Sequence, residues 1–145
     1  EKGEYQLTNA LDNMKNDGMI FVPGQVIEWW DCGNKNATVH TNQRVLANAN
    51  GQKLVADNVV NENSEVIEPC YIGENVRLKN CKIGPYVSID SNTELSDCTI
   101  DNSIIQSNSQ ITNANLTNSM IGNHVTFDGN ANQVSLGDFS TQKID

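Results

Sequence analysis

The chain has few basic residues, few cysteines and no long hydrophobic run. Its 145 residues include 9 Lys and Arg against 18 Asp and Glu, which gives a formal net charge of −9. This charge argues against a nucleic acid or an anionic membrane as a partner. No stretch is typical of a secretory signal, and none approaches the roughly 20 apolar residues of a membrane-spanning helix. We therefore expect a cytoplasmic protein.

The four cysteines do not form a metal-binding pattern. Cys32, Cys70, Cys81 and Cys98 include no CxxC pair, and no His stands close to them in the sequence. This argues against a zinc site. Cys70, Cys81 and Cys98 instead occupy positions for small residues in the repeat described next, so we predict that their thiols are buried and reduced.

A repeat with steps of five or six residues organises the chain from residue 67 to residue 137. An α-helix would place apolar residues every three or four positions and a half-buried strand every two, so neither explains these steps. We interpret the pattern as a structural repeat in which each unit buries one aliphatic side chain. The members of this ladder are Ile67, Ile72, Leu78, Ile83, Ile89, Leu95, Ile100, Ile105, Ile111, Leu116, Ile121 and Phe127.

Small or β-branched residues form a second register between the members of the ladder. Gly, Asn and Asp, which tolerate left-handed backbone angles, are frequent beside them. Short strands that turn tight corners over a small residue would produce this pairing, as in a parallel β-helix. The second register consists of Cys70, Val76, Cys81, Val87, Thr93, Cys98, Ser103, Ser109, Ala114, Ser119 and Val125.

The pattern resembles the hexapeptide repeat of left-handed β-helix proteins, in which three rungs make one triangular coil. The resemblance implies a mainly β fold with about four to five stacked coils. One disturbance of the ladder, at residues 128–135, is expected to be a protruding corner that precedes the next rung at Leu136. Phe127 and Phe139 are expected to cap the open end of the last coil.

The segment before the repeat predicts two helices and a pair of short strands. Residues 1–18 are typical of a helix with Thr8 as its N-cap and Gly18 at its end. Residues 19–28 are rich in β-formers around a turn signal, which predicts a hairpin or two strands. A second helix is predicted over residues 35–46, capped by Asn34 or Asn36.

These elements predict a division of the chain into three parts. Two helices and a hairpin enclose little core, because short segments bury too small a share of their surface. We therefore interpret residues 1–47 as the C-terminal remnant of a larger α/β domain, residues 48–58 as a linker and residues 59–145 as the β-helix.

Two motifs resemble elements of sugar-phosphate nucleotidyltransferases. Residues 4–11 (EYQLTNAL) are similar to the EYQLTDAL element of that family, and residues 29–34 (WWDCGN) are similar to its W-x-D-x-G-T element. Both stand in the expected order, upstream of a β-helix. The chain thus resembles glucose-1-phosphate thymidylyltransferase-like and mannose-1-phosphate guanylyltransferase-like proteins that carry a hexapeptide tail.

The resemblance implies a reaction in which a sugar 1-phosphate displaces pyrophosphate from a nucleoside triphosphate, with Mg²⁺ as cofactor. Asp31 aligns with the family's magnesium-binding aspartate and Glu4 with its sugar-binding glutamate. Lys2, beside Glu4, is a candidate neighbour of the sugar phosphate. A structural alternative is that Asp31 caps the following helix. The family's Gly-rich loop, catalytic Lys and second magnesium-binding aspartate have no counterpart in these 145 residues, so we expect no catalytic residue and no turnover in this chain alone.

Two other functions are compatible with a β-helix. One is an acyl-CoA-dependent acetyltransferase for amino sugars, for which His124 is the candidate general base, although it falls on a corner that normally faces solvent. The other is a purely structural module for assembly or regulation. Because a parallel solenoid exposes sheet edges at its ends, we expect a homo-oligomer.

Overall fold

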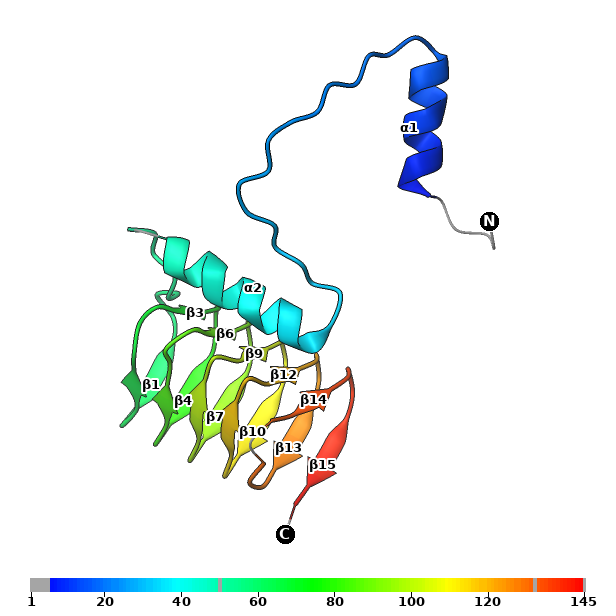
Figure 1. Ribbon diagram of the computed structural model, residues 1–145. Helices are drawn as coiled ribbons and strands as arrows, with labels where there is room; N and C mark the ends of the chain where they lie inside the picture. Colours follow the sequence, from blue (N-terminus) through cyan, green and yellow to red (C-terminus); the bar gives the residue numbers. More distant parts are fainter. Residues whose placement is uncertain (1–5, 50, 132, 145) are drawn as a thin grey trace.

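The computed structural model describes residues 6–49, 51–131 and 133–144. Residues 53–144 form a parallel β-solenoid of about five turns, preceded by two helices, which confirms the mainly β fold predicted from the repeat. The turns contribute short strands to three flat sheets of six, four and five strands, and Figure 1 shows the turns stacked along one axis. Within the described residues, neither helix combines the length and the apolar character needed to cross a membrane.

All strands pair in parallel with the strand one turn away. The six-stranded sheet contains β1 (Val60–Glu62), β4 (Arg77–Lys79), β7 (Glu94–Ser96), β10 (Gln110–Thr112), β13 (Thr126–Asp128) and β15 (Thr141–Lys143). The four-stranded sheet contains β2 (Glu65–Val66), β5 (Lys82–Ile83), β8 (Thr99–Asp101) and β11 (Asn115–Thr117). The five-stranded sheet contains β3 (Cys70–Ile72), β6 (Val87–Ile89), β9 (Ile104–Ile105), β12 (Met120–Ile121) and β14 (Ser135–Leu136).

The core is the ladder that the sequence predicts, and the predicted second register lies inside it. Every ladder residue from Ile72 to Phe127 is at most 1% exposed, and every residue of the second register is buried as well. Cys70, Cys81 and Cys98 are therefore free thiols inside the solenoid, as predicted, whereas Cys32 is exposed. Phe127 lies in this core on β13, so the expectation that it caps the open end is wrong.

The prediction that Ile67 begins the ladder is wrong by one residue. Val66, not Ile67, pairs with Ile83, and Ile67 is only half-buried. The next turn explains the shift, because Ile83 pairs with Ile100, 17 residues later. A turn of the same length places Val66 in register with Ile83. Ile67 was predicted instead because it stands five residues before Ile72, which also fits the spacing of the repeat.

The corners depend on asparagine, as the sequence suggested. Among the described residues, twelve other than glycine have positive φ, and eight of these are Asn. Asn tolerates this backbone region because its short polar side chain bonds locally. Corner side chains also bond from turn to turn: Asn63 Nδ2 donates to Asn80 Oδ1 at 3.0 Å, and Asn80 Nδ2 donates to Asp97 Oδ1 at 3.1 Å.

Helix α2 (Lys35–Asn48) lies over the five-stranded sheet (Figure 1). Asn34 is its N-cap, as predicted, because Asn34 Oδ1 accepts a hydrogen bond from the Ala37 N–H at 3.0 Å. Val39 is fully buried and Leu46 is 5% exposed. Helix α2 therefore packs against the solenoid, whereas we assigned most of it to the remnant of another domain; that division of the chain stays a prediction.

Helix α1 (Leu7–Asn16) and residues 19–33 have a different character. No residue of α1 is buried, and the predicted N-cap Thr8 is wrong because Thr8 lies inside the helix, after the N-cap Gln6. Gly18 ends the helix as predicted, with φ of +90°. Residues 19–33 form no strand, so the predicted hairpin is wrong; a two-stranded hairpin without a packing partner is marginal in water. Figure 1 shows this segment as a long extended connection from α1 to α2.

The last turn is less regular than the others. Leu136 pairs with Ile121, so the rung predicted after residues 128–135 exists, but the four-stranded sheet receives no strand from this turn in the described residues. Phe139 is 74% exposed and stacks on the His124 ring with centroids 4.8 Å apart, so it does not cap the core either.

Candidate functional site

The predicted magnesium ligand Asp31 lies in the extended segment immediately before α2. Its carboxylate Oδ1 accepts a hydrogen bond from the Gly33 N–H at 2.9 Å, a local turn typical of Asp. A Cβ on Gly33 would lie 3.3 Å from that same oxygen, so glycine gives the carboxylate its room. The side chain is otherwise exposed. The carboxylate is thus held by one backbone donor and faces outward.

Asp31 does not cap α2, which removes the structural alternative that we weighed. Asn34 occupies the N-cap, three residues later, and its side chain makes the capping bond. What remains for the Asp31 carboxylate is the Gly33 N–H and solvent.

The main chain around Asp31 is tied to the outer side of α2 by threonine hydroxyls. Thr41 Oγ1 donates to the Asp31 carbonyl oxygen at 2.7 Å. The Thr38 hydroxyl shares its proton between the Asn34 carbonyl oxygen at 2.9 Å and the Cys32 carbonyl oxygen at 3.2 Å, so Thr41 makes the stronger tie. Thr38 and Thr41 stand three residues apart and therefore on one side of the helix. The side chain bonds thus run from the helix to the backbone and leave the Asp31 carboxylate available.

A charged contact fixes the same segment three residues earlier. Arg44 donates to Glu28 Oε1 from Nε at 2.8 Å and from Nη2 at 2.5 Å. The pKa of Glu28 is lowered, first by a hydrogen bond from the Trp30 side chain and then by Arg44. Trp30 is 44% exposed, compared with 81% for Trp29. The Trp pair thus includes one indole that secures the segment and one that extends from it.

The donor set suits a hard cation but supplies only part of a site. Carboxylate oxygens are the ligands that Mg²⁺ prefers, and a protein often offers it one or two carboxylates plus substrate phosphates. Within the described residues no three His, Cys, Asp or Glu side chains converge. Asp31 would therefore hold Mg²⁺ as one protein ligand among others. Glu4 and Lys2, the predicted sugar and phosphate contacts, lie outside the described residues.

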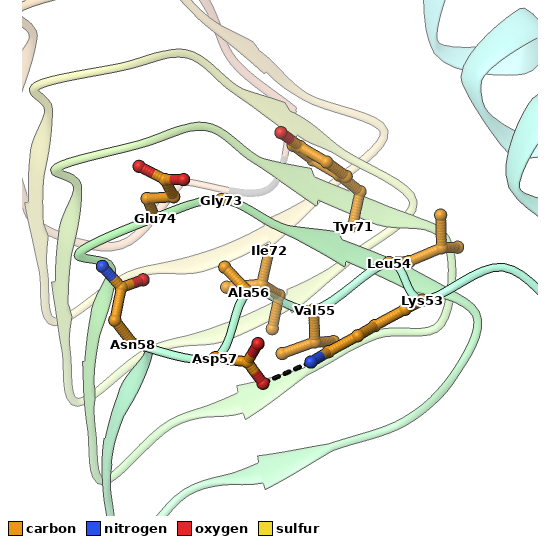
Figure 2. A pocket seen from close by; sticks show the side chains of 10 residues that line it. All are labelled: Lys53, Leu54, Val55, Ala56, Asp57, Asn58, Tyr71, Ile72, Gly73 and Glu74. Carbon is orange, nitrogen blue, oxygen red and sulfur yellow. Dashed lines mark hydrogen bonds and ion pairs between the residues drawn. The ribbon is translucent and has the colours of Figure 1, made fainter.

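Two hollows lie at the N-terminal end of the solenoid and were not predicted from the sequence. Figure 2 shows the first, about 540 Å³, where Lys53 and Asp57 form an ion pair across its rim and Tyr71 and Glu74 border it. The second, about 750 Å³, lies between the end of α2 and the corner at Pro69. They exist because Val55 pairs with Ile72 and so starts the first turn inside the segment that we expected to be a linker.

Neither the two hollows nor the candidate general base His124 forms a site in which reactive groups converge on a substrate pocket. Figure 2 shows the short Val55 and Ala56 side chains between the charged residues of the first hollow. His124 is exposed at a corner with φ of +55°, and its ring partner is Phe139. A general base needs a group that orients it and a substrate pocket beside it. The Asp31 segment is therefore the candidate site.

Comparison with known proteins finds distant similarity to one class of enzyme. No family model matches the chain. The chain is 27% identical, over 165 aligned positions, to a glucose-1-phosphate thymidylyltransferase of Streptomyces griseus, and 26% identical to one of Streptomyces antibioticus. Each match covers 99% of this chain and 46% of the relative.

The chain is distantly similar to the C-terminal half of glucose-1-phosphate thymidylyltransferases. It spans about half the length of the relatives that it matches. The match includes nearly the whole chain, so it covers both residues 28–33 and the solenoid. The resemblance inferred from two short motifs and a repeat is confirmed as a distant similarity.

Proposed function

We propose that this chain is the C-terminal part of a sugar-1-phosphate nucleotidyltransferase. The whole protein would convert a nucleoside triphosphate and a sugar 1-phosphate into a nucleoside diphosphate sugar and pyrophosphate. The observation that carries the proposal is the match of 99% of the chain to the C-terminal half of glucose-1-phosphate thymidylyltransferases. The site supports it, because an exposed aspartate held by a backbone N–H stands in the family's W-x-D-x-G context.

In this proposal Asp31 holds Mg²⁺ at the end of the catalytic domain. Bound Mg²⁺ would neutralise charge on the triphosphate and on the departing pyrophosphate, where phosphoryl transfer needs it. The Gly33 N–H keeps one carboxylate oxygen oriented, and the Thr41 bond to the Asp31 carbonyl keeps the main chain in place. Glu4 would bind a sugar hydroxyl and Lys2 would lie near the sugar phosphate.

The exposed apolar residues before α2 support a larger catalytic domain. Leu7, Ile20 and Ile27 are 75%, 90% and 95% exposed, and such a run of exposed large apolar side chains marks an interaction surface. In the proposal these residues pack against the part of the catalytic domain that this chain does not contain. The α/β assignment of residues 1–47 rests on the same argument.

We assign assembly or regulation to the solenoid and the cytoplasm to the protein. Helix α2 covers the five-stranded sheet, which leaves the outer faces of the six-stranded and four-stranded sheets for contacts in a homo-oligomer. The buried free thiols of Cys70, Cys81 and Cys98 suit a reducing compartment.

The decisive experiment assays the protein encoded by the complete reading frame. Pyrophosphate release from each nucleoside triphosphate is measured with glucose 1-phosphate and Mg²⁺. We expect turnover, and a loss of about 10²-fold or more in kcat for Asp31→Asn, because one charge-stabilising group is removed. Asp90→Asn is the matched control and leaves the rate unchanged, because Asp90 is an exposed carboxylate on the solenoid that likewise accepts one backbone N–H bond. The 145-residue chain alone should release none.

Two results would contradict the proposal. One is a complete protein that releases pyrophosphate with none of the nucleoside triphosphates and sugar 1-phosphates tested. The other is an active protein in which Asp31→Asn and Asp90→Asn behave alike, which would remove Asp31 from the metal site while leaving the family reaction in place.

A further inference from the structure

Helix α2 contacts the solenoid with one side and the Asp31 segment with the other. We propose that the β-solenoid sets the position of the Asp31 carboxylate through α2, with Thr41 as the positioning residue. The identification of Asp31 as a metal ligand rests on the proposed function, whereas the mechanical connection rests on contacts within this chain.

The inner side of α2 is fixed to the solenoid by polar bonds and apolar contact. The Ser88 hydroxyl on β6 donates to Asn42 Oδ1 at 2.6 Å, and Lys35 Nζ donates to the Asn118 carbonyl oxygen at 2.7 Å. Val39 and Leu46 are buried on the same side. These four helix residues follow each other at steps of three or four, as one helix face requires.

The outer side of α2 fixes the main chain on either side of the Asp31 carboxylate. Thr41 bonds the Asp31 carbonyl, Thr38 bonds the Cys32 carbonyl, and Arg44 bonds Glu28. The three helix residues again follow at steps of three. Because adjacent helix residues point about 100° apart, Asn42 can bond the solenoid while Thr41 bonds the Asp31 segment.

The helix would not hold this segment without the solenoid. Isolated helices of this length are marginal in water, so α2 depends on its packing against the five-stranded sheet. The Asp31 segment, residues 28–33, has no strand pairing. Apart from the local turn to Gly33 and the contact between the Trp30 and Glu28 side chains, the bonds that hold it in the described residues go to α2. The solenoid therefore fixes the position of the Asp31 carboxylate in two steps. The five-stranded sheet holds α2 in place, and α2 holds the main chain around Asp31.

The test measures amide hydrogen exchange of Gly33 in the 145-residue chain by NMR. The Gly33 N–H reports the Asp31 carboxylate directly, because it is bonded to Oδ1. Thr41→Val removes the hydroxyl at nearly constant shape, and Thr41→Ser restores a donor. We expect the Gly33 amide to exchange about fivefold faster in Thr41→Val, which corresponds to the net contribution of one typical hydrogen bond. The wild-type exchange rate should return in Thr41→Ser.

A second pair of variants tests the step from sheet to helix. Asn42→Ala removes the acceptor of the Ser88 bond, and it should also accelerate exchange of Gly33, although Asn42 does not contact the Asp31 segment. Thr126→Ala, on the outward side of the six-stranded sheet away from α2, is the matched control and should leave Gly33 unchanged.

The outcomes separate this proposal from the proposed function. Unchanged Gly33 exchange in Thr41→Val, or in Asn42→Ala, overturns the positioning role. The pyrophosphate-release assay of the complete protein tests the metal site independently, because the other ligands are present there. If Asp31→Asn behaves like the control Asp90→Asn in that assay while the exchange results are as expected, the positioning stands and the metal assignment fails.

Discussion

Residues 53–144 bury most of their large apolar side chains, whereas residues 6–33 leave theirs exposed to solvent. In the solenoid, one aliphatic residue per rung points inward and meets its equivalents from the turns before and after, as in Leu78, Leu95 and Ile111. In residues 6–33, large apolar side chains are at least as frequent as in the solenoid but remain exposed, and α1 buries none.

The difference shows that apolar content alone does not make a core. Each solenoid rung buries little by itself, but stacking adds the same contact once per turn, so a narrow chain of short strands acquires a continuous interior. A single helix and an extended segment have no second copy of themselves to pack on. They need a partner, which the proposed catalytic domain would supply.

The largest expected effect tests the solenoid side of this comparison. Ile100→Ala removes a fully buried side chain in the middle of the stack, and we expect about 2–5 kcal/mol less stability in urea unfolding followed by circular dichroism. The matched change on the same strand, Thr99→Ala, removes an outward side chain and should cost less than about 0.5 kcal/mol.

The same unfolding measurement on a variant of α1 tests whether the exposed region is independent of the solenoid core. Leu11→Ala shortens an apolar side chain in a helix that contacts no core, so the unfolding midpoint of the 145-residue chain should shift little. A loss comparable to that of Ile100→Ala would mean that α1 packs against the solenoid in solution and that the two regions share one core.

A smaller loss of stability is expected from substitutions at the corners. Two substitutions of one Asn distinguish the contribution of its left-handed backbone from that of its side-chain hydrogen bonds. Asn80 has φ of +52° and bonds the corner residues of both neighbouring turns. Asn80→Ala loses these bonds and places an alanine in the left-handed region, which costs roughly 1–2 kcal/mol. Asn80→Gly loses the same bonds without that strain. Glycine should therefore be the less destabilising change in urea unfolding. Equal losses of stability would show that the side-chain hydrogen bonds, not the backbone conformation, matter at this corner.

The solenoid was predictable because its signal is local and repeated. Each rung of five or six residues contains one inward aliphatic residue and one small residue. A wrong assignment in one rung does not shift the next, because the next rung carries the same pattern. The exception, Ile67, fell at the start of the ladder, where the preceding turn offers Val55 and Asn61 as weaker counterparts of Ile72 and Leu78. At that edge two candidate positions satisfied the same spacing.

The candidate site was predictable in kind but not in its attachments. The W-x-D-x-G pattern identified Asp31 from a resemblance, and Asn34 was identified as the cap from local chemistry. The bonds from Thr41 to Asp31 and from Asn42 to Ser88 join residues 10 and 46 positions apart, and no local pattern contains them. The hairpin failed for the same reason: β-propensity in residues 19–28 had no partner strand to satisfy.

The smallest expected effect concerns the polar contact that joins the two regions. The pKa of Glu28 is lowered from its ordinary 4.5, first by the Trp30 indole and then by Arg44, so the bond to α2 favours the charged carboxylate. A carboxylate with a lowered pKa in the folded state contributes its full stabilisation above its unfolded pKa and loses it as the pH falls through the lowered value. The segment should thus stay attached at pH 5–7 and loosen only in stronger acid.

An NMR titration of the Trp30 indole N–H signal checks this, with Trp29 as the internal control, because Trp29 is 81% exposed and is not among the groups that shift Glu28. Arg44→Gln removes the cation but keeps a donor, so the midpoint at Trp30 should move up towards the ordinary value, while Arg44→Lys should move it less because the charge remains. The effect is small because the side chains of Glu28 and Arg44 are 40% and 46% exposed and solvent screens the pair. A midpoint that is identical in the wild-type chain and in Arg44→Gln would mean that Arg44 does not hold Glu28 in solution, and the attachment of residues 28–33 to the solenoid would then depend on the threonine hydroxyls alone.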